Sequence, residues 1–299
     1  MEQNTLEVTE QPEVFSFTSI RELVNETLKT EIGQIPSLIG LSTGFRALDE
    51  AIGGFQKGQL TTIAVKPGMG KTAFLLSVAN NMAVRNNYAV AIFSAERSSR
   101  KMTSRLLESE TGMSVEKLQA GKLKASEKDH MHSLVNGIAK ARIFLDDTPG
   151  LGAEELVGKC RQLKARHEVD LIIVDYLELL NHSRMGTNSR IEELSDIVKL
   201  IKEIARELNI PVLLFSQMPS MFPGFGSTPR PELKDLPHFL AELSDVVLVL
   251  HRSDLDPRQG KIPGKARVEV IVAKHQDPDR QEVVPLAFIE SLSKFTDLS

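Results

Sequence analysis

Apolar runs of strand length alternate with amphipathic stretches from residue 60 onward. The strand-like runs are LTTIAV, AVAIFSA, RIFLDD, DLIIVDY, PVLLFSQ and DVVLVLHR. Stretches with helical spacing separate the earlier runs, namely KTAFLLSVANNMAVR, SSRKMTSRLLES, EELVGKCRQLKARH and RIEELSDIVKLIKEIAREL. Continuous apolar strands between helices indicate a buried, mostly parallel sheet that helices cover on both faces. The pattern therefore predicts an α/β fold.

The two ends of the chain have different patterns. Towards the C-terminus, RVEVIVAKH and EVVPLAFIE flank the turn-like QDPDRQ, which predicts an antiparallel hairpin. Residues 1–15 are polar and acidic and predict a disordered lead-in. In the next stretch, FTSIRELVNETLKTEI, Ser19 and Glu22 form a capping-box pattern. Its apolar positions have helical spacing and are Ile20, Leu23, Val24, Leu28 and Ile32.

The helix predicted over residues 18–32 has an apolar stripe that needs cover. The stripe could pack on its own chain, or it could dock on a neighbouring subunit. The sequence pattern alone favours neither arrangement.

The composition narrows the class of protein. Hydrophobic residues make up 41% and charged residues 25%, as in an ordinary soluble globular protein. The net charge of −4 argues against a generally basic nucleic-acid binder but leaves local basic loops open. No apolar run approaches the length of a membrane span, and the acidic start argues against a secretory signal. The only cysteine, Cys160, lies in a helical pattern and fits a packing role in a reducing, cytoplasmic setting.

The stretch VKPGMGKT comes after a strand and opens a helix, which is the order that a phosphate-binding loop requires. Such a helix start offers free backbone N–H groups and a positive dipole end to phosphates. Val65 stands where the usual motif has glycine, and this strand-end position mainly needs a compact, buried residue. The residues predicted to bind nucleotide are Pro67, Gly68, Met69, Gly70, Lys71, Thr72 and Ala73, with Arg252 as a candidate for packing on the base.

Polar residues end three further strand-like runs. Asp175 ends LIIVD in a Walker B arrangement, where a carboxylate reaches the Mg²⁺ shell beside Thr72. Glu96 comes after AIFSA and could orient or deprotonate a water, or could simply favour the start of a helix. Gln217 ends PVLLFSQ and could bond a γ-phosphate or the attacking water, or could be an ordinary loop amide. Together with the loop, these positions predict a nucleoside triphosphate site.

From about Leu41 to Ser299 the sequence resembles the C-terminal, RecA-like ATPase domain of the DnaB-type replicative DNA helicases. The resemblance lies in LSTGFRALDEAIGGFQKGQLTTIAVKPGMGKT, SRLLESETGMSVEKLQAGKL, IFLDDTPGL, DLIIVDYLELL, IKEIARELNIPVLLFSQ and LAFIESLSKFTDL, which occur in the family's order. It implies a RecA-like core over residues 38–299, ATP and Mg²⁺ as cofactors, and a linker helix in residues 16–37.

The resemblance also implies roles for individual residues. Lys71 and Thr72 would hold phosphate and Mg²⁺, Glu96 would be the catalytic base, and Gln217 a sensor. Lys274, in VIVAKHQ, matches a basic finger that acts in the neighbouring subunit's ATP site. Residues 18–32 would dock on the next subunit of a ring, which is expected to be hexameric.

The chain also departs from the family pattern. The resemblance does not extend to the family's usual N-terminal helical domain, and the first 15 residues are not expected to replace it. Gln276 occupies the position of an arginine finger, and a neutral amide cannot offset phosphate charge. Either the site is weakened or a nearby arginine such as Arg280 fills the role. The DNA-facing segment keeps Asp235 and Leu236 but is shorter and differs after them.

Two functions are compatible with these matches to the family pattern and departures from it. The first is an ATP-dependent DNA helicase that forms a ring and translocates on single-stranded DNA in replication. The candidate DNA-phosphate partners for this function are Arg184, Arg190, Arg230 and Lys234. The second is a non-motor paralogue, a nucleotide-dependent assembly or DNA-binding module with weak ATPase activity.

Overall fold

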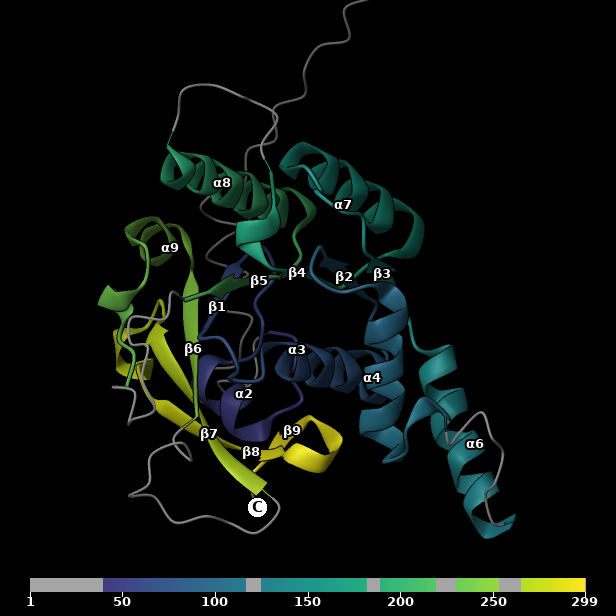
Figure 1. The fold of residues 1–299 in the computed structure, drawn as a ribbon. Coiled ribbons are helices and arrows are strands. Elements are labelled where there is room, and N and C mark those ends of the chain that lie inside the picture. The colour runs from purple at the N-terminus through teal and green to yellow at the C-terminus, as the bar shows by residue number, and fades with distance from the viewer. Residues whose placement is uncertain (1–39, 117–124, 182–188, 219–229, 253–264, 299) are drawn as a thin grey trace, which may run out of the picture. The chain divides into compact units, whose positions relative to one another are not determined.

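A mixed sheet forms the centre of the computed structural model, which describes residues 40–116, 125–181, 189–218, 230–252 and 265–298. Its strands are β1 (Leu60–Val65), β2 (Val90–Ser94), β3 (Ile143–Asp146), β4 (Leu171–Asp175), β5 (Val212–Gln217), β6 (Val246–Arg252), β7 (Lys265–Lys274), β8 (Val283–Ile289) and β9 (Lys294–Asp297). They lie in the order β3-β2-β4-β5-β1-β6-β7-β8-β9 (Figure 1). The strands from β3 to β6 are parallel, and β7, β8 and β9 are antiparallel additions.

Helices cover both faces of this sheet. They are α2 (Arg46–Ile52), α3 (Lys71–Asn80), α4 (Ser99–Thr111), α7 (Ala153–His167), α8 (Arg190–Leu208) and α9 (His238–Leu243). A further helix, α6 (Ala125–Lys140), packs on α4. Helices α2, α3 and α4 share one hydrophobic core with the sheet, and α7, α8 and α9 share the other (Figure 1). A π-helical segment, Asn81–Arg85, continues α3.

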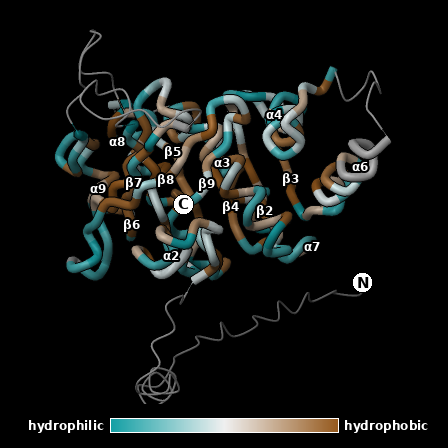
Figure 2. The backbone as a smooth tube through the Cα atoms, turned by 90° about the horizontal axis from the view of Figure 1, so that it is seen from below, coloured by the Kyte–Doolittle hydropathy of each residue, from teal (hydrophilic) through white to brown (hydrophobic). Residues whose placement is uncertain are grey.

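Strand residues point alternately into the two cores. Along β5, Leu213 and Phe215 belong to the core under α3, whereas Val212 and Leu214 belong to the core under α8. Because both faces are buried, the residues of such a strand are mostly apolar, and the strands form the brown centre of Figure 2. Cys160 of α7 is 1% exposed, and burial raises the pKa of its thiol to about 12.

Helix starts are fixed by side chains that accept backbone hydrogen bonds. The Ser98 side chain accepts from the N–H of Lys101 at the start of α4. Ser189 and Glu192 form a reciprocal capping box at the start of α8. These caps set where α4 and α8 begin relative to the strands before them.

The structure confirms the predicted α/β sheet, the helices on both of its faces and the C-terminal hairpin, in which β7 and β8 pair antiparallel. Each predicted strand-like run contains a strand, and each of the four helical stretches predicted between those runs contains a helix. The pattern did not single out α2, α6 or α9. Residues 1–39, with the lead-in and the helix predicted over 18–32, lie outside the described residues.

Candidate nucleotide site

The loop between β1 and α3 has a backbone that glycine makes possible. Val65 ends β1 with 1% exposure, as expected for a buried first position of the loop. Gly68 and Gly70 have φ angles of 80° and 94°, in the left-handed region that other residues avoid. A Cβ atom on Gly70 would also lie 3.2 Å from the ring of Phe295 in β9. Both backbone angle and space therefore require glycine at position 70.

The register of the parallel strands brings the strand-end residues to one edge of the sheet. Asp175 of β4 lies opposite Ser94 of β2, and Gln217 of β5 lies opposite Val65 of β1. All four positions are at the carboxyl ends of their strands, where open α/β sheets bind ligands. The predicted carboxylate and amide thus lie at the same edge as the phosphate loop.

Lys71 is the centre of the site. Its ammonium Nζ lies 2.6 Å from Glu96 Oε2 and 2.7 Å from Asp175 Oδ1. The same nitrogen lies 3.6 Å from the centroid of the Tyr176 ring, a cation–π distance. The Lys71 side chain is 12% exposed and that of Asp175 is fully buried. A single cation therefore bridges the Walker B position and the predicted catalytic base.

Asp175 is a buried carboxylate whose charged form is only partly compensated. Burial raises the pKa of Asp175, while the nearby Lys71 ammonium opposes that shift. Ser94 Oγ donates to Asp175 Oδ2 at 3.3 Å. Asp175 Oδ1 has no well-directed hydrogen bond within the described residues, so its contact with Lys71 is an ion pair. A metal ion at that oxygen would take the place of the Lys71 ammonium.

Two residues that the sequence analysis did not single out complete the edge. Arg97 Nε donates to Thr72 Oγ1 at 3.2 Å, so it reaches the predicted Mg²⁺ ligand. Glu178 Oε1 accepts from Ser216 Oγ at 2.6 Å and from the Gln217 backbone N–H at 3.2 Å. Glu178 thereby positions the end of β5, where the side chain of Gln217 is exposed.

These residues line a cavity of about 430 Å³. Its lining is Val65, Lys66, Pro67, Gly68, Gly70, Lys71, Thr72, Ala73, Glu96, Arg97, Arg105, Gln217, Phe288 and Ser293. Met69, predicted with the loop, is buried at 5% exposure and is not part of that lining. The cavity combines basic side chains, free helix-start N–H groups and a carboxylate, as a phosphate ester with a bound water would require.

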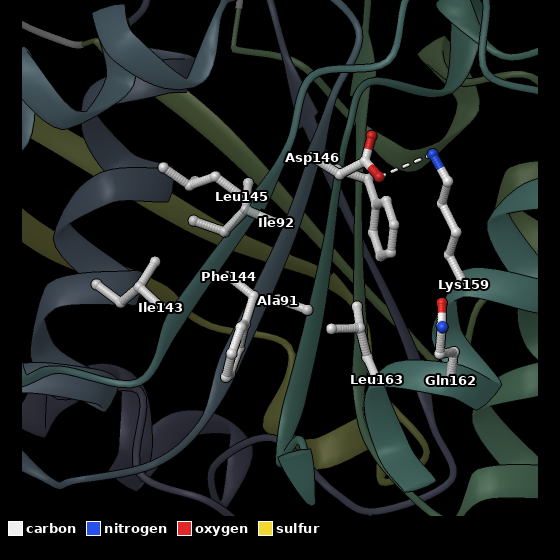
Figure 3. A pocket seen from close by; sticks show the side chains of 10 residues that line it. Ala91, Ile92, Ile143, Phe144, Leu145, Asp146, Lys159, Gln162 and Leu163 are labelled. Atoms are coloured by element: carbon white, nitrogen blue, oxygen red, sulfur yellow. Dashed lines mark ion pairs between the residues drawn. The ribbon is translucent and has the colours of Figure 1, made fainter. Parts of the chain in front are cut away.

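A second cavity, of about 450 Å³, lies against β2, β3 and α7 (Figure 3). Asp146 and Lys159 face each other at one end of it, with 2.8 Å between Oδ2 and Nζ (Figure 3). Its other lining residues are mostly apolar, including Phe144 and Leu163. Because its two charges pair with each other, this cavity is a weaker candidate for binding an anion.

Lys274 lies away from the phosphate loop of its own chain. It ends β7 opposite Val247, beside the start of β1, whereas the loop comes after the end of β1. Its ammonium donates to the carbonyls of Ala241, Ser244 and Glu242 at 2.7, 2.6 and 3.3 Å, at the end of α9. Burial lowers the pKa of Lys274, and nearby Lys202 adds to that shift.

Arg252 lies at the margin of the phosphate-loop cavity. Its NH2 atom is 2.9 Å from Glu290 Oε1, and its guanidinium carbon is 5.3 Å from the ring of Phe288, which lines the cavity. Gln276 is exposed. Arg280 Nε lies 3.6 Å from Asp277 Oδ2 in the same turn.

The described DNA-binding candidates are all engaged in ion pairs. The N–O distances are 2.6 Å from Arg190 to Glu193, 2.9 Å from Arg230 to Glu269 and 2.7 Å from Lys234 to Glu232. Arg190 also donates to the carbonyls of Glu178 and Leu180. Arg184 lies outside the described residues. Of the described candidates, Arg190, Arg230 and Lys234, none lines the phosphate-loop cavity.

The described residues contain neither a cluster of metal-ligating side chains nor a membrane-spanning helix. Within them, no group of three or more His, Cys, Asp or Glu side chains could hold a metal ion on its own. None of the helices described is long and apolar enough to cross a membrane.

The sheet, the glycine loop and the strand-end carboxylate together define a phosphate-loop nucleotide-binding domain. Comparison with known sequences makes the assignment specific. The sequence model of the family described as DnaB-like helicase C terminal domain matches residues 40–297. The chain therefore belongs to the DnaB-like helicase C-terminal domain family.

Curated relatives and solved structures agree with that assignment. The chain is 32% identical over 98% of its length to the replicative DNA helicase DnaB of Geobacillus stearothermophilus. It is 31% identical over 99% of its length to the replicative DNA helicase DnaC of Bacillus subtilis. It spans 65% and 66% of those relatives, just under two thirds of each.

The structural neighbours have the same fold. One is the ATPase domain of G40P, with a TM-score of 0.82 and 29% identity over 95% of this chain and 100% of that one. Another is a DnaB-like replicative helicase described with its interactions with primase, with a TM-score of 0.79 and 29% identity over 95% and 68% of the two chains.

Proposed function

We propose that this chain binds and hydrolyses ATP at the phosphate-loop cavity, as the motor domain of a DnaB-type replicative DNA helicase. The observation that carries the proposal is the position of the Lys71 ammonium, 2.6 Å from Glu96 and 2.7 Å from Asp175 at the start of α3. Incoming phosphates would compete for this ammonium and meet the free N–H groups of the same helix start. Membership of the helicase family supports the same activity.

The residues present fit a Mg²⁺ ion that arrives with the nucleotide. Mg²⁺ takes oxygen ligands and is usually held by one or two protein oxygens together with phosphates and waters. Thr72 Oγ1 and the buried Asp175 Oδ1, whose partner in the free chain is the Lys71 ammonium, are oxygens of this kind. When bound, the ion would offset charge on the β- and γ-phosphates. This requirement for few protein ligands agrees with the lack of a larger acidic cluster in the described ranges.

Glu96 is the proposed base for hydrolysis. A water oxygen would bond to the γ-phosphorus, and the bond from that phosphorus to the β,γ-bridging oxygen would break, with its electron pair leaving on ADP. The water proton would pass to the Glu96 carboxylate, which is partly exposed to the cavity. Gln217, held by Glu178 through its backbone, lines the same cavity and would contact the γ-phosphate or the water.

Assembly and DNA binding complete the proposal. We infer a homo-oligomeric ring, expected to be hexameric, in which residues 18–32 dock on the next subunit. Lys274 lies at the opposite end of the strands from its own phosphate loop, so any role for it in hydrolysis must be at another subunit's site. Single-stranded DNA is the proposed polymer substrate, because the relatives are replicative DNA helicases by name.

A second candidate, the non-motor paralogue with weak ATPase activity, is favoured by one observation. The described DNA-binding candidates Arg190, Arg230 and Lys234 each pair with an acidic residue of their own chain. Such pairs would have to open before these side chains could bind a DNA backbone.

One experiment separates the two candidates. Phosphate release from MgATP is measured with and without single-stranded DNA, beside strand separation of a forked duplex, with Lys71→Ala as the control variant. A motor is expected to be stimulated by DNA and to separate strands only with ATP. Nucleotide binding with slow, unstimulated hydrolysis and no separation would favour the paralogue. A wild-type chain that binds no nucleotide would overturn both.

A further inference from the structure

Arg97 lines the phosphate-loop cavity but has no part in the reaction proposed above. It comes directly after Glu96 and precedes the Ser98 cap of α4. Its backbone N–H donates to Ser94 Oγ at 3.3 Å, which ties its position to the end of β2. Its side chain lines the phosphate-loop cavity and is 30% exposed. The backbone is therefore anchored while the guanidinium faces the space for nucleotide.

The contacts of the guanidinium in the free chain are made to groups that the reaction needs. Arg97 Nε donates to Thr72 Oγ1 at 3.2 Å, and Arg97 NH2 lies 3.7 Å from Glu96 Oε1. Thr72 is a proposed Mg²⁺ ligand and Glu96 the proposed base. Glu96 is thus held by Lys71 on one oxygen and by Arg97 on the other. Binding of MgATP must remove both cations from Glu96 or loosen their hold.

The excess of positive charge in the cavity indicates that the Lys71 and Arg97 side chains would turn from Glu96 to a bound anion. Lys66, Lys71, Arg97 and Arg105 line it, against the single lining carboxylate of Glu96. Burial lowers the pKa of Arg105, and the positive charge of Arg97 adds to that shift. These two guanidinium groups therefore lie close enough to repel each other, and an anion between them would relieve the repulsion. A triphosphate is such an anion.

We propose that Arg97 is a catalytic residue that contacts the γ-phosphate of ATP bound to its own subunit and stabilises the charge of the transition state. The proposal rests on ATP hydrolysis at this cavity. A guanidinium offers several donors in a planar fork that matches phosphate oxygens. Its movement onto the γ-phosphate leaves Thr72 Oγ1 for the metal and leaves Glu96 for the water. Arg97 would thus supply positive charge and release the base in one movement.

A purely structural role does not explain these contacts. The Arg97–Glu96 pair is long at 3.7 Å, and both side chains are about one third exposed. Ion pairs of this kind contribute little to stability. Replacing Arg97 by alanine is therefore expected to leave the thermal midpoint nearly unchanged, so its effects on nucleotides can be measured on a folded chain.

The test compares a ground-state ligand with a transition-state mimic. The affinities for Mg²⁺–ADP and for Mg²⁺–ADP–aluminium fluoride are measured with a fluorescent ADP for the full wild-type chain, Arg97→Ala, Arg97→Lys and Arg100→Ala. Arg100 is the matched control, since it is an exposed arginine three residues further on, in the first turn of α4, and does not line the cavity. Arg97→Ala is expected to bind ADP within about threefold of wild type. It should lose about 100-fold or more in affinity for the mimic, as removal of one transition-state donor typically does.

Turnover and a mixing experiment complete the test. Arg97→Ala should hydrolyse ATP about 100-fold more slowly than wild type, Arg97→Lys should recover part of that loss, and Arg100→Ala should match wild type. Arg97→Ala mixed with Lys71→Ala should remain inactive, because neither chain then has both the loop lysine and Arg97 in one site. Recovery of turnover in the mixture would place Arg97 in a neighbour's site and overturn the proposal.

Two further outcomes would also overturn it, and they separate it from the proposed function. Equal losses for ADP and for the mimic in Arg97→Ala, or no loss for either, would mean that Arg97 has no selective contact with the transition state. If the wild-type chain hydrolyses ATP in that case, only the role of Arg97 fails. If the wild-type chain binds neither ligand, ATP hydrolysis at this cavity fails with it.

Discussion

Replacing Lys71 by methionine tests how the site is held together before any nucleotide binds. Methionine keeps an unbranched apolar stem but removes the ammonium that lies 2.7 Å from Asp175 Oδ1. Asp175 is 1% exposed, so its carboxylate would remain buried without its cation. Removing one partner of a buried ion pair typically costs about 3–5 kcal/mol. We expect the free energy of unfolding at pH 7 to fall by about that amount in Lys71→Met.

Urea unfolding monitored by circular dichroism measures the change. With a slope of about 2–3 kcal/mol per molar urea, the loss moves the midpoint down by roughly 1–2.5 M. The double variant Lys71→Met/Asp175→Asn removes both charges and should regain most of the stability, because residues in contact are not additive. Both variants should fail to bind MgATP. An unchanged midpoint in Lys71→Met, or a double variant as unstable as the sum of the single ones, would refute the buried-pair reasoning.

Three other predictions concern single side chains. Gly70→Ala should lose about 1–2 kcal/mol of stability together with nucleotide binding, because the φ angle of Gly70 is 94°. Gly158→Ala, at an exposed position of α7, should lose no stability, and equal effects of the two substitutions would contradict this reasoning. Burial raises the pKa of Asp146, but hydrogen bonds from Lys159 and Thr148 lower it more, so the pKa is below its ordinary value in the folded chain. The Asp146 carboxylate therefore stabilises the folded state above pH 3.8, and this contribution is lost as the pH falls through the lowered pKa. The gap in thermal midpoint between wild type and Asp146→Asn should therefore narrow as the pH falls below 3.8, and a constant gap would contradict this. Lys274→Met should lower the thermal midpoint without nucleotide, because it removes the three carbonyl contacts at the end of α9; an unchanged midpoint would deny them a structural role.

The sheet could be predicted from the sequence because strands buried on both faces are mostly apolar. The run LTTIAV in β1 and the run LIIVD in β4 are fully buried, and their only polar members are two threonines and the site carboxylate Asp175. Helix α2 has only seven residues and α9 only six, too short for helical periodicity to be distinctive. Their helical structure depends on packing against the sheet, which the local sequence does not encode.

The candidate site could be predicted in part for a related reason. Lys71, Asp175 and Gln217 each stand at or near the junction of a strand with the next loop or helix, and parallel strands bring such junctions to one edge. Arg97 and Glu178 were missed because their contacts join distant segments. Arg97 reaches Thr72 across 25 residues, and Glu178 reaches Ser216 across 38. No local motif marks a side chain whose role depends on that register.

The proposed mechanism is tested most directly by asking whether Glu96 is the catalytic base, and one measurement answers this. Phosphate release from saturating MgATP is recorded for the wild-type chain and for Glu96→Gln, after a fluorescent ATP titration has established that both bind nucleotide. The amide keeps the shape of the side chain but cannot accept the water proton, so Glu96→Gln should bind ATP as tightly as wild type and release phosphate at least about 100-fold more slowly. Phosphate release near the wild-type rate would contradict the account, because the base for hydrolysis would then lie elsewhere in the protein.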